Sequence, residues 1–154
     1  MIATYLAHTS TKRNVIGWDT NLKRINLANK SASKSPNLKF EAKNALSRMP
    51  KVDAVILSDF IHHVPKKFHQ KLFTNIYSSL KKGGVMVIKE INTQDLVRAK
   101  ISRIFDFAFY PKDKIFFLNA QHLTSDLEKI GFKVKRQKVK KLFPGSTNLF
   151  ICTK

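Results

Sequence analysis

The sequence predicts an α/β fold in which helices cover both faces of one mostly parallel sheet. Short apolar runs alternate with segments of helical spacing, several runs are apolar almost throughout, and the last two are joined by a turn signal at residues 143–146. Such runs are typical of parallel strands buried on both faces, and alternation of strands with helices gives a three-layer architecture. We expect a single domain over residues 1–154.

The first third of the chain indicates helix, strand, helix and strand in that order. Residues 2–7 carry apolar side chains at helical spacing and predict the last turns of a helix. Residues 15–19 form a short apolar run that ends in an acid, as expected of a buried strand. Residues 22–28 again have helical spacing, and residues 38–42 alternate as a strand does.

The middle third predicts two buried strands and two helices. Residues 52–57 are typical of a central strand. Pro65 suits a helix start, and the apolar side chains that follow share one face until Gly83, which is expected to end the helix. Residues 85–88 predict another buried strand, and residues 93–109 a further helix.

The last third predicts a capped helix and an antiparallel hairpin. Asn119 is placed to cap a helix that ends at Gly131, where glycine adopts a left-handed backbone without strain. Residues 132–138 and 149–153 are the expected hairpin strands, because the Pro-Gly turn signal lies between them.

Composition narrows the class of protein. With 43% hydrophobic and 25% charged residues, the chain is neither disordered nor of low complexity. Its one cysteine, Cys152, excludes an internal disulfide and a zinc site of several thiolates, so a reducing, cytoplasmic setting is expected. No segment reaches the ~18 apolar residues of a membrane span.

Polar residues that directly follow the strands are the candidates for function, because open α/β sheets bind ligands at the carboxyl ends of their strands. These positions are Asp19, residues 43–45, Asp59 and residues 90–92. A carboxylate such as Asp19 accepts paired hydrogen bonds from the two hydroxyls of a ribose. The alternative at this point is that Asp19, or Thr20 beside it, caps the following helix.

Five segments together resemble the class I S-adenosylmethionine-dependent methyltransferases. Residues 15–19 and 40–45 are similar to the second and third strands of that family, and residues 52–65 to its fourth strand and the loop after it. Residues 80–85 are similar to the glycine turn and fifth strand, and residues 127–151 to the final helix and hairpin. The resemblance implies a Rossmann-like, mostly parallel methyltransferase sheet with a C-terminal antiparallel hairpin.

S-adenosylmethionine is the cofactor that this resemblance implies, and it also implies three pairs of residues as the cofactor site. The first pair would hold the ribose hydroxyls, the second would lie beside the adenine, and the third would lie beside the methionine part. These residues are Asp19 with Thr20, Asn44 with Ala45, and Asp59 with Phe60. Asn44 stands where an acid is more usual, yet its side-chain carbonyl also accepts a hydrogen bond from an exocyclic amine.

The chain departs from the family pattern before Asp19. No glycine-rich loop precedes this acid, and counting back about 20 residues, the usual spacing in dinucleotide-binding folds, passes Met1. We therefore expect the first strand to be missing. In the family that strand lies between the second and the fourth. An upstream start, a split or truncated gene, and a second chain or direct strand pairing that fills the gap remain alternatives.

His62 and His63 are the candidate catalytic residues, because a histidine near neutral pKa can serve as a general base beside an acceptor. The competing interpretation is that one histidine packs or caps while the other is solvated. No carboxylate or thiolate lies at ligand spacing beside them, so no metal site is expected.

Charge and aromatic clustering suggest the partners. The 29 Lys and Arg against 10 Asp and Glu give +19, a field that attracts polyanions such as RNA or a membrane surface. The aromatic cluster in residues 105–117 follows three basic residues, which favours a small-molecule or lipid-like acceptor with an anionic group unless the aromatics are core. Residues 129–154 hold eight basic residues and no acid, either a solvated strand edge or a track for a phosphate backbone.

Three functional hypotheses follow. The first is an S-adenosylmethionine-dependent methyltransferase acting on a small-molecule or lipid-like acceptor. The second is a non-catalytic remnant or subunit of a methyltransferase fold that needs a partner chain. The third is a basic RNA-binding module of the same fold, which would lose affinity steeply as salt rises.

Overall fold

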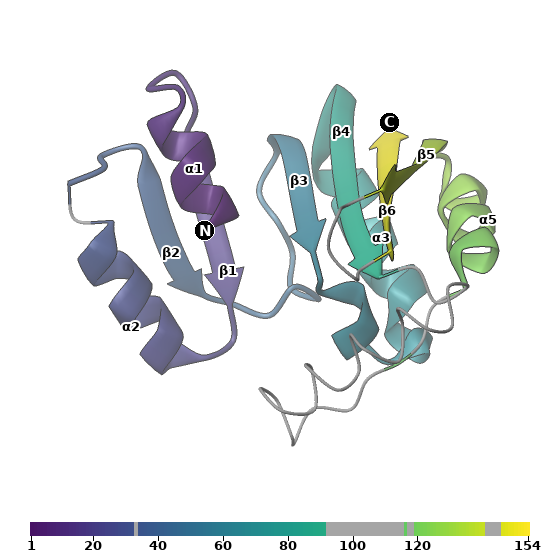
Figure 1. The fold of residues 1–154 in the computed structure, drawn as a ribbon, viewed down its shortest axis with the longest axis horizontal. Helices are drawn as coiled ribbons and strands as arrows, with labels where there is room; N and C mark the ends of the chain where they lie inside the picture. Colours follow the sequence, from purple (N-terminus) through teal and green to yellow (C-terminus); the bar gives the residue numbers. More distant parts are fainter. Residues whose placement is uncertain (33, 92–115, 117–118, 141–145) are drawn as a thin grey trace. The chain divides into compact units, whose positions relative to one another are not determined.

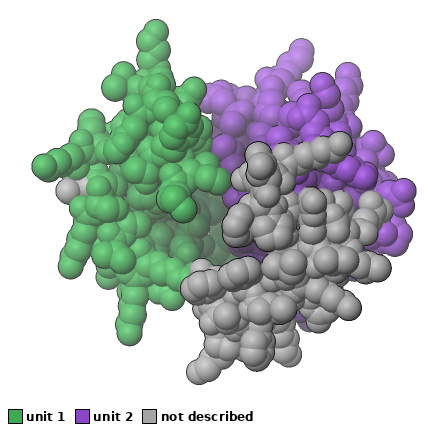
Figure 2. Space-filling model, in the orientation of Figure 1, with its two compact units in different colours: residues 1–47 green, residues 48–154 purple. Residues whose placement is uncertain are grey.

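A computed structural model describes residues 1–32, 34–91, 116, 119–140 and 146–154. The chain divides into two compact units, residues 1–47 and 48–154, shown in different colours in Figure 2. Each unit is described by itself, and the single domain stays a prediction. Among the described residues, none of the helices has the length and apolar character needed to cross a membrane.

The first unit is a pair of parallel strands packed against two helices (Figure 1). Its elements in order are α1 (Ile2–His8), β1 (Val15–Asp19), α2 (Leu22–Ser31) and β2 (Leu38–Ala42). The strands pair in register from Val15 opposite Leu38 to Asp19 opposite Ala42. The two predicted strands are confirmed with the predicted bounds.

The first unit has a small core and one covered edge. Ala7 of α1, Ala32 at the end of α2 and Leu38 of β2 form its buried cluster. The side-chain amide of Asn29 on α2 donates to the Phe40 carbonyl and accepts from the Phe40 amide, each at 3.0 Å. Helix α2 therefore occupies backbone groups of β2 as a further strand would.

Helix α2 is capped by a residue other than the two predicted. The side chain of Asn21 accepts from the amides of Lys23 and Arg24 at 3.0 and 3.2 Å. The expectation that Asp19 or Thr20 caps this helix is wrong, because Asp19 is the last residue of β1 and Thr20 connects that strand to the cap residue Asn21.

The second unit is a four-stranded mixed sheet with two longer helices. Strand order is β3-β4-β6-β5; β3 and β4 are parallel, and β6 is antiparallel to β4 and to β5. The predicted C-terminal antiparallel hairpin is thereby confirmed. The elements are β3 (Val52–Ser58), the short 3-10 helices Ile61–His63 and Lys66–Phe68, α3 (His69–Ser79), β4 (Leu80–Ile91), α5 (Ala120–Ile130), β5 (Lys133–Lys140) and β6 (Ser146–Thr153).

The core of the second unit lies between the sheet and its helices. Helices α3 and α5 pack against each other and against the sheet. In β4 every second residue is buried, namely Met86, Ile88 and Glu90. Phe73 of α3 and Leu127 of α5 are fully buried apolar side chains of the same unit. One face of β4 is thus covered, and Glu90 is the polar residue at its carboxyl end.

The ends of the two helices compare differently with the predictions. Helix α5 begins after Asn119, whose side chain accepts from the Gln121 and His122 amides, and it ends at Gly131 with φ of 112°. The predicted cap at Asn119 and the predicted helix end at Gly131 are both confirmed. Helix α3 ends at Ser79, and Gly83 lies inside β4 with φ of 73°. The expectation that Gly83 ends the helix is wrong.

Strands β1 and β3 are edge strands of their sheets in the part of the chain that the structure describes. Among the described residues, β1 pairs with β2 alone and β3 pairs with β4 alone. These are the two strands between which the resemblance places the first strand of the family. The predicted helix over residues 93–109 and the turn over residues 143–146 lie wholly or mainly outside the described residues.

Candidate functional site

The carboxyl end of β1 carries Asp19, whose side chain is 38% exposed. Its Oδ1 accepts from the Asn21 amide at 2.8 Å, and Nη1 of Arg24 lies 3.8 Å from its Oδ2. The Lys43 amide donates to the Asp19 carbonyl at 3.0 Å, which joins the ends of β1 and β2. Because a carboxylate offers about four acceptor sites, these contacts leave capacity for two hydroxyl donors.

The loop after β2 carries Asn44 and Ala45. Asn44 is exposed and Ala45 is half-buried, and Oδ1 of Asn44 accepts from the Leu46 amide at 2.8 Å. An amide oxygen has two lone pairs, so one stays available for a further donor such as an exocyclic amine. The exposed Thr20 follows Asp19 at the same end of the unit.

Glu41, on β2, is the other carboxylate near this end of the first unit. Its oxygens lie 2.7 Å from Nζ of Lys39 and 2.8 Å from Nζ of Lys43, and it accepts from Nε1 of Trp18 at 3.2 Å. The hydrogen bonds of Lys39 and then of Lys43 lower the pKa of Glu41 to about 2. Glu41 is committed to these cations, which leaves Asp19 as the better candidate for a ligand.

The carboxyl end of β3 places Asp59 in a left-handed conformation with φ of 50°. The Asp59 amide donates to the Lys89 carbonyl at 2.9 Å, so the pairing of β3 with β4 continues to this residue. Oδ2 of Asp59 accepts from Oγ of Ser58 at 3.0 Å and forms an ion pair with Nζ of Lys89. The carboxylate predicted beside the methionine part therefore already holds a cation.

Glu90, at the carboxyl end of β4, contacts the loop after β3. Its Oε1 accepts from the Phe60 amide at 3.0 Å. Nδ1 of His62 lies 3.1 Å from Oε1 and 2.9 Å from Oε2 of the same carboxylate. Glu90 is 3% exposed and His62 6% exposed, so a carboxylate and an imidazole are paired inside the unit.

The two histidines differ in their surroundings. His62 is buried, its carbonyl accepts from the Phe116 amide at 2.7 Å, and its ring centroid lies 4.1 Å from that of His63. His63 is half-buried. Within the described residues no three side chains of His, Cys, Asp or Glu gather into a group that would hold a metal ion. The catalytic role of the two histidines stays a prediction.

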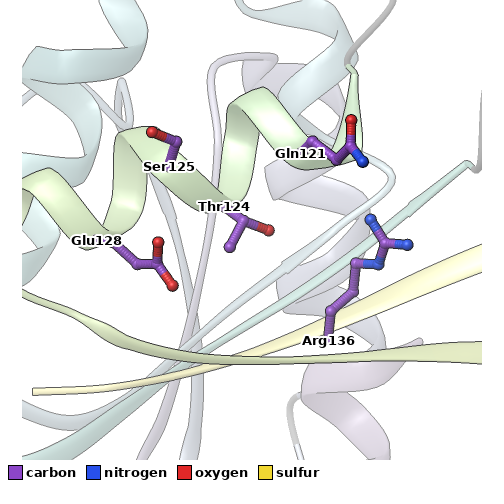
Figure 3. Close-up of a pocket in the computed structure, with 5 residues that line it drawn as sticks. All are labelled: Gln121, Thr124, Ser125, Glu128 and Arg136. Atoms are coloured by element: carbon purple, nitrogen blue, oxygen red, sulfur yellow. The ribbon is translucent and has the colours of Figure 1, made fainter.

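A shallow depression of about 330 Å³ lies elsewhere, between α5 and β5 (Figure 3). Helix α5 and Arg136 of β5 form its walls, at the opposite end of the sheet from β3. It contains none of the predicted site residues. Its lining residues are Gln121, Thr124, Ser125, Glu128 and Arg136.

The site residues fall into two groups, one in each unit. Asp19 and Asn44 belong to residues 1–47, and Phe60, His62 and Glu90 belong to residues 48–154. In both units the polar groups follow the carboxyl ends of parallel strands, as the sheet rule for ligand sites requires. A family model described as a methyltransferase domain matches residues 3–137.

The chain belongs to the methyltransferase domain family. This confirms the resemblance to the class I S-adenosylmethionine-dependent methyltransferases, the Rossmann-like α/β fold and, at the level of the family, the predicted cofactor. None of the curated proteins matches the chain in sequence.

Solved structures show the same fold at low sequence identity. Magnesium protoporphyrin IX methyltransferase from Synechocystis PCC 6803, with bound S-adenosylhomocysteine, is similar at TM-score 0.73 and 14% identity over 99% of this chain and 68% of that one. The S-adenosylmethionine-dependent methyltransferase SibL is similar at TM-score 0.78 and 17% identity over 96% and 46%. The cyclase SpnF is similar at TM-score 0.76 and 13% identity over 99% and 69%.

These similarities show the fold of the chain but do not identify its reaction. The chain spans 68% and 46% of the two methyltransferase chains, and the third similar protein is a cyclase. Because one fold hosts different reactions, the reaction depends on the specific residues of the site. Glu90 is the residue that sequence reasoning left without a role, although its place directly after an apolar run was the available signal.

Proposed function

We propose that this protein is an S-adenosylmethionine-dependent methyltransferase acting on a small-molecule or lipid-like acceptor. The observation that carries the proposal is Asp19, a carboxylate with unused acceptor capacity at the carboxyl end of β1 in a member of the methyltransferase domain family. Asp19 would accept from the ribose hydroxyls, with Thr20 beside it. Asn44 and Ala45 would lie by the adenine, and Phe60 by the methionine part.

The residues present suit that cofactor chemically. A ribose offers two hydroxyl donors to a carboxylate, and an adenine offers an exocyclic amine to an amide carbonyl. When bound, S-adenosylmethionine supplies a methyl group on a sulfonium. The protein would then hold the acceptor in line with the methyl donor and exclude water. Such positioning provides a large share of the rate enhancement.

Cofactor binding by the purified chain tests the proposal. Isothermal titration with S-adenosylmethionine and with S-adenosylhomocysteine should give saturable binding. Asp19→Asn should weaken it by about 10- to 100-fold, because hydrogen bonds to a charged group contribute about 1.5–3 kcal/mol. Asp53→Asn is the matched control, since Asp53 is exposed and pairs with Lys81 at the start of β3. A folded chain without binding heat, or equal affinity of Asp19→Asn, refutes the proposal.

The roles of His62 and His63 are open to a direct test. A general base makes the rate depend on pH through the pKa of that base. We expect His63→Gln to change the pH profile of methyl transfer more than His62→Gln, because His62 is buried against Glu90. Identical profiles for both variants and the natural chain would exclude a histidine base.

The acceptor class follows from the clustering of aromatic and basic residues in the sequence. Residues 105–117 hold five phenylalanines and a tyrosine, and most of this segment lies outside the described residues. We propose an apolar acceptor that carries an anionic group. Transfer of a labelled methyl group into the organic phase of a mixed metabolite extract supports this class, whereas label confined to polar metabolites counts against it.

A second candidate function, the subunit that needs a partner chain, is favoured by β3. In the part of the chain that the structure describes, this strand lies at the edge of its sheet, and Asp53 is its only charged side chain. Natural sheets usually protect such an end with charge or cover it. At the other end β5 carries five basic residues. A chain that is monodisperse only when co-expressed with a strand-bearing fragment encoded upstream supports this candidate; a monodisperse, active chain alone refutes it.

An anionic partner is the third proposal, and the edge strand β5 favours it. Lys133, Lys135 and Lys138 are exposed along this strand. Binding of RNA or anionic vesicles should fall linearly in log–log plots against salt, and binding to only one of the two identifies the partner. Affinity without salt dependence excludes both. The cytoplasmic setting stays a proposal, supported by the single cysteine, and fractionation of cells tests it.

A further inference from the structure

Glu90 is a buried carboxylate whose side-chain hydrogen bonds, among the residues that the structure describes, go to the loop after β3. Oε1 accepts from the Phe60 amide at 3.0 Å, and Nδ1 of His62 lies 2.9 Å from Oε2. A buried carboxylate is costly unless hydrogen bonds satisfy it. Both partners lie in the loop after β3, so the contacts that compensate Glu90 also determine where that loop runs.

The strand register explains why Glu90 reaches this loop. The β3–β4 pairing runs to Ser58 opposite Lys89, and Glu90 is the next residue along β4. Side chains alternate between the faces of a strand, so Lys89 and Glu90 point to opposite sides. Lys89 pairs with Asp59 and Glu90 holds Phe60. Successive residues of β4 thus fix successive residues of the loop.

The contact between Glu90 and His62 determines which ring nitrogen of His62 carries the proton. An ionised carboxylate only accepts hydrogen bonds, so Nδ1 of His62 carries the proton when Glu90 is ionised. A hydrogen bond to one ring nitrogen of a histidine sets its tautomer and the orientation of the ring. His62 in turn accepts from the Phe116 amide through its carbonyl. The loop is therefore held at Phe60 by its backbone and at His62 by its side chain.

We propose that Glu90 is a positioning residue for the cofactor site: it holds the Phe60 amide and the His62 imidazole and so fixes the loop that would contact the methionine part of S-adenosylmethionine. The inference rests on the proposed function for the identity of the ligand. It also assigns His62 a structural task in that loop. A pair of this kind adds little net stability compared with apolar packing, and its effect lies in selecting one conformation.

Two substitutions separate positioning from bulk stability. Glu90→Ala removes both contacts, and we expect S-adenosylhomocysteine affinity to fall at least tenfold. Glu90→Gln keeps the side-chain shape and an acceptor for the Phe60 amide, so affinity should stay within about threefold. Ile88→Val is the matched control, because Ile88 is fully buried on the same strand, two residues before Glu90, and carries no hydrogen-bonding side chain. Its affinity should equal that of the natural chain although its stability falls.

Nuclear magnetic resonance of the ligand-free chain gives readouts that do not depend on cofactor. In Glu90→Gln the amide group faces Nδ1 of His62 as a donor, so the ¹⁵N shifts of His62 should report a change of tautomer. In Glu90→Ala exchange of the Phe60 amide should accelerate at least tenfold relative to Ile88→Val. If Glu90→Ala does not fold, the tautomer in Glu90→Gln decides.

The outcomes distinguish the inference from the proposed function. Unchanged affinity in Glu90→Ala, or an unchanged His62 tautomer in Glu90→Gln, overturns the positioning role. A natural chain that binds no cofactor overturns the proposed function. In that case faster Phe60 exchange in Glu90→Ala still supports the hold of Glu90 on the loop, and unchanged exchange overturns it.

Discussion

Gly17, two residues before Asp19 on β1, is a position where adding one methyl group should destabilise the first unit. It lies opposite Phe40 of β2 in the parallel pair. A Cβ built on Gly17 would lie 2.6 Å from Cδ1 and 2.7 Å from Cε1 of the Phe40 ring. The ring occupies the space that a side chain at position 17 would need.

The expected cost follows from these distances. Carbon atoms pack best at about 3.5–4.0 Å, so the Phe40 ring must move by roughly 1 Å in Gly17→Ala. Overpacking of this kind costs about 1–3 kcal/mol. Removal of glycine from a strand returns about 0.5–1 kcal/mol. We expect Gly17→Ala to lower the free energy of unfolding of the first unit by about 0.5–2 kcal/mol.

Urea unfolding followed by tryptophan fluorescence measures this effect. The chain has one tryptophan, Trp18, which adjoins Gly17, so its emission reports on the first unit. Phe40→Leu alone measures the loss of the ring, and the double variant with Gly17→Ala completes a double-mutant cycle. A favourable coupling should appear because the smaller side chain makes room. Gly17→Ala at or above natural stability, or a cycle without coupling, refutes the reasoning.

Three further predictions concern single groups. Asn21→Ala should cost about 1 kcal/mol in urea unfolding, because it removes the cap of α2. Burial raises the pKa of Cys152 to about 12, so a thiol reagent at pH 8 should react with it only after unfolding. Lys39 and Lys43 lower the pKa of Glu41 to about 2. The contribution of ionised Glu41 to the stability of the folded chain is therefore complete above about pH 4.5 and is lost as the pH falls towards 2. Glu41→Gln should remove that part of the acid dependence of unfolding.

The strands and most helices could be predicted because local pattern and tertiary burial agree there. Residues 15–19 and 38–42 become β1 and β2 with unchanged bounds. Helix α5 is bounded by Asn119 and Gly131, two residues that satisfy helix ends through their own geometry. In these segments a few neighbouring residues are enough to determine the local structure.

Two predictions of helix ends were wrong because contacts outside the local pattern determine where those helices begin or end. Gly83 matched a helix terminator, yet the chain leaves α3 at Ser79 because Leu80 pairs with Val52 of β3 and is fully buried. Strand pairing across 28 positions is not visible in local spacing. Similarly, Asp19, Thr20 and Asn21 are all able to cap a helix, and the exit of the chain from β1 selects the third.

The candidate site illustrates the same limit and also refines the chemistry expected of it. Sequence alone places acids after strands, but only the register of β3 with β4 shows that Lys89 takes the carboxylate of Asp59 and that Glu90 takes the Phe60 amide. A carboxylate already paired with a lysine is a poor acceptor for a further cationic group. A ligand at this loop would therefore gain little from the Asp59 carboxylate, and Glu90, which accepts from the Phe60 amide, is the acid that we propose to position the loop.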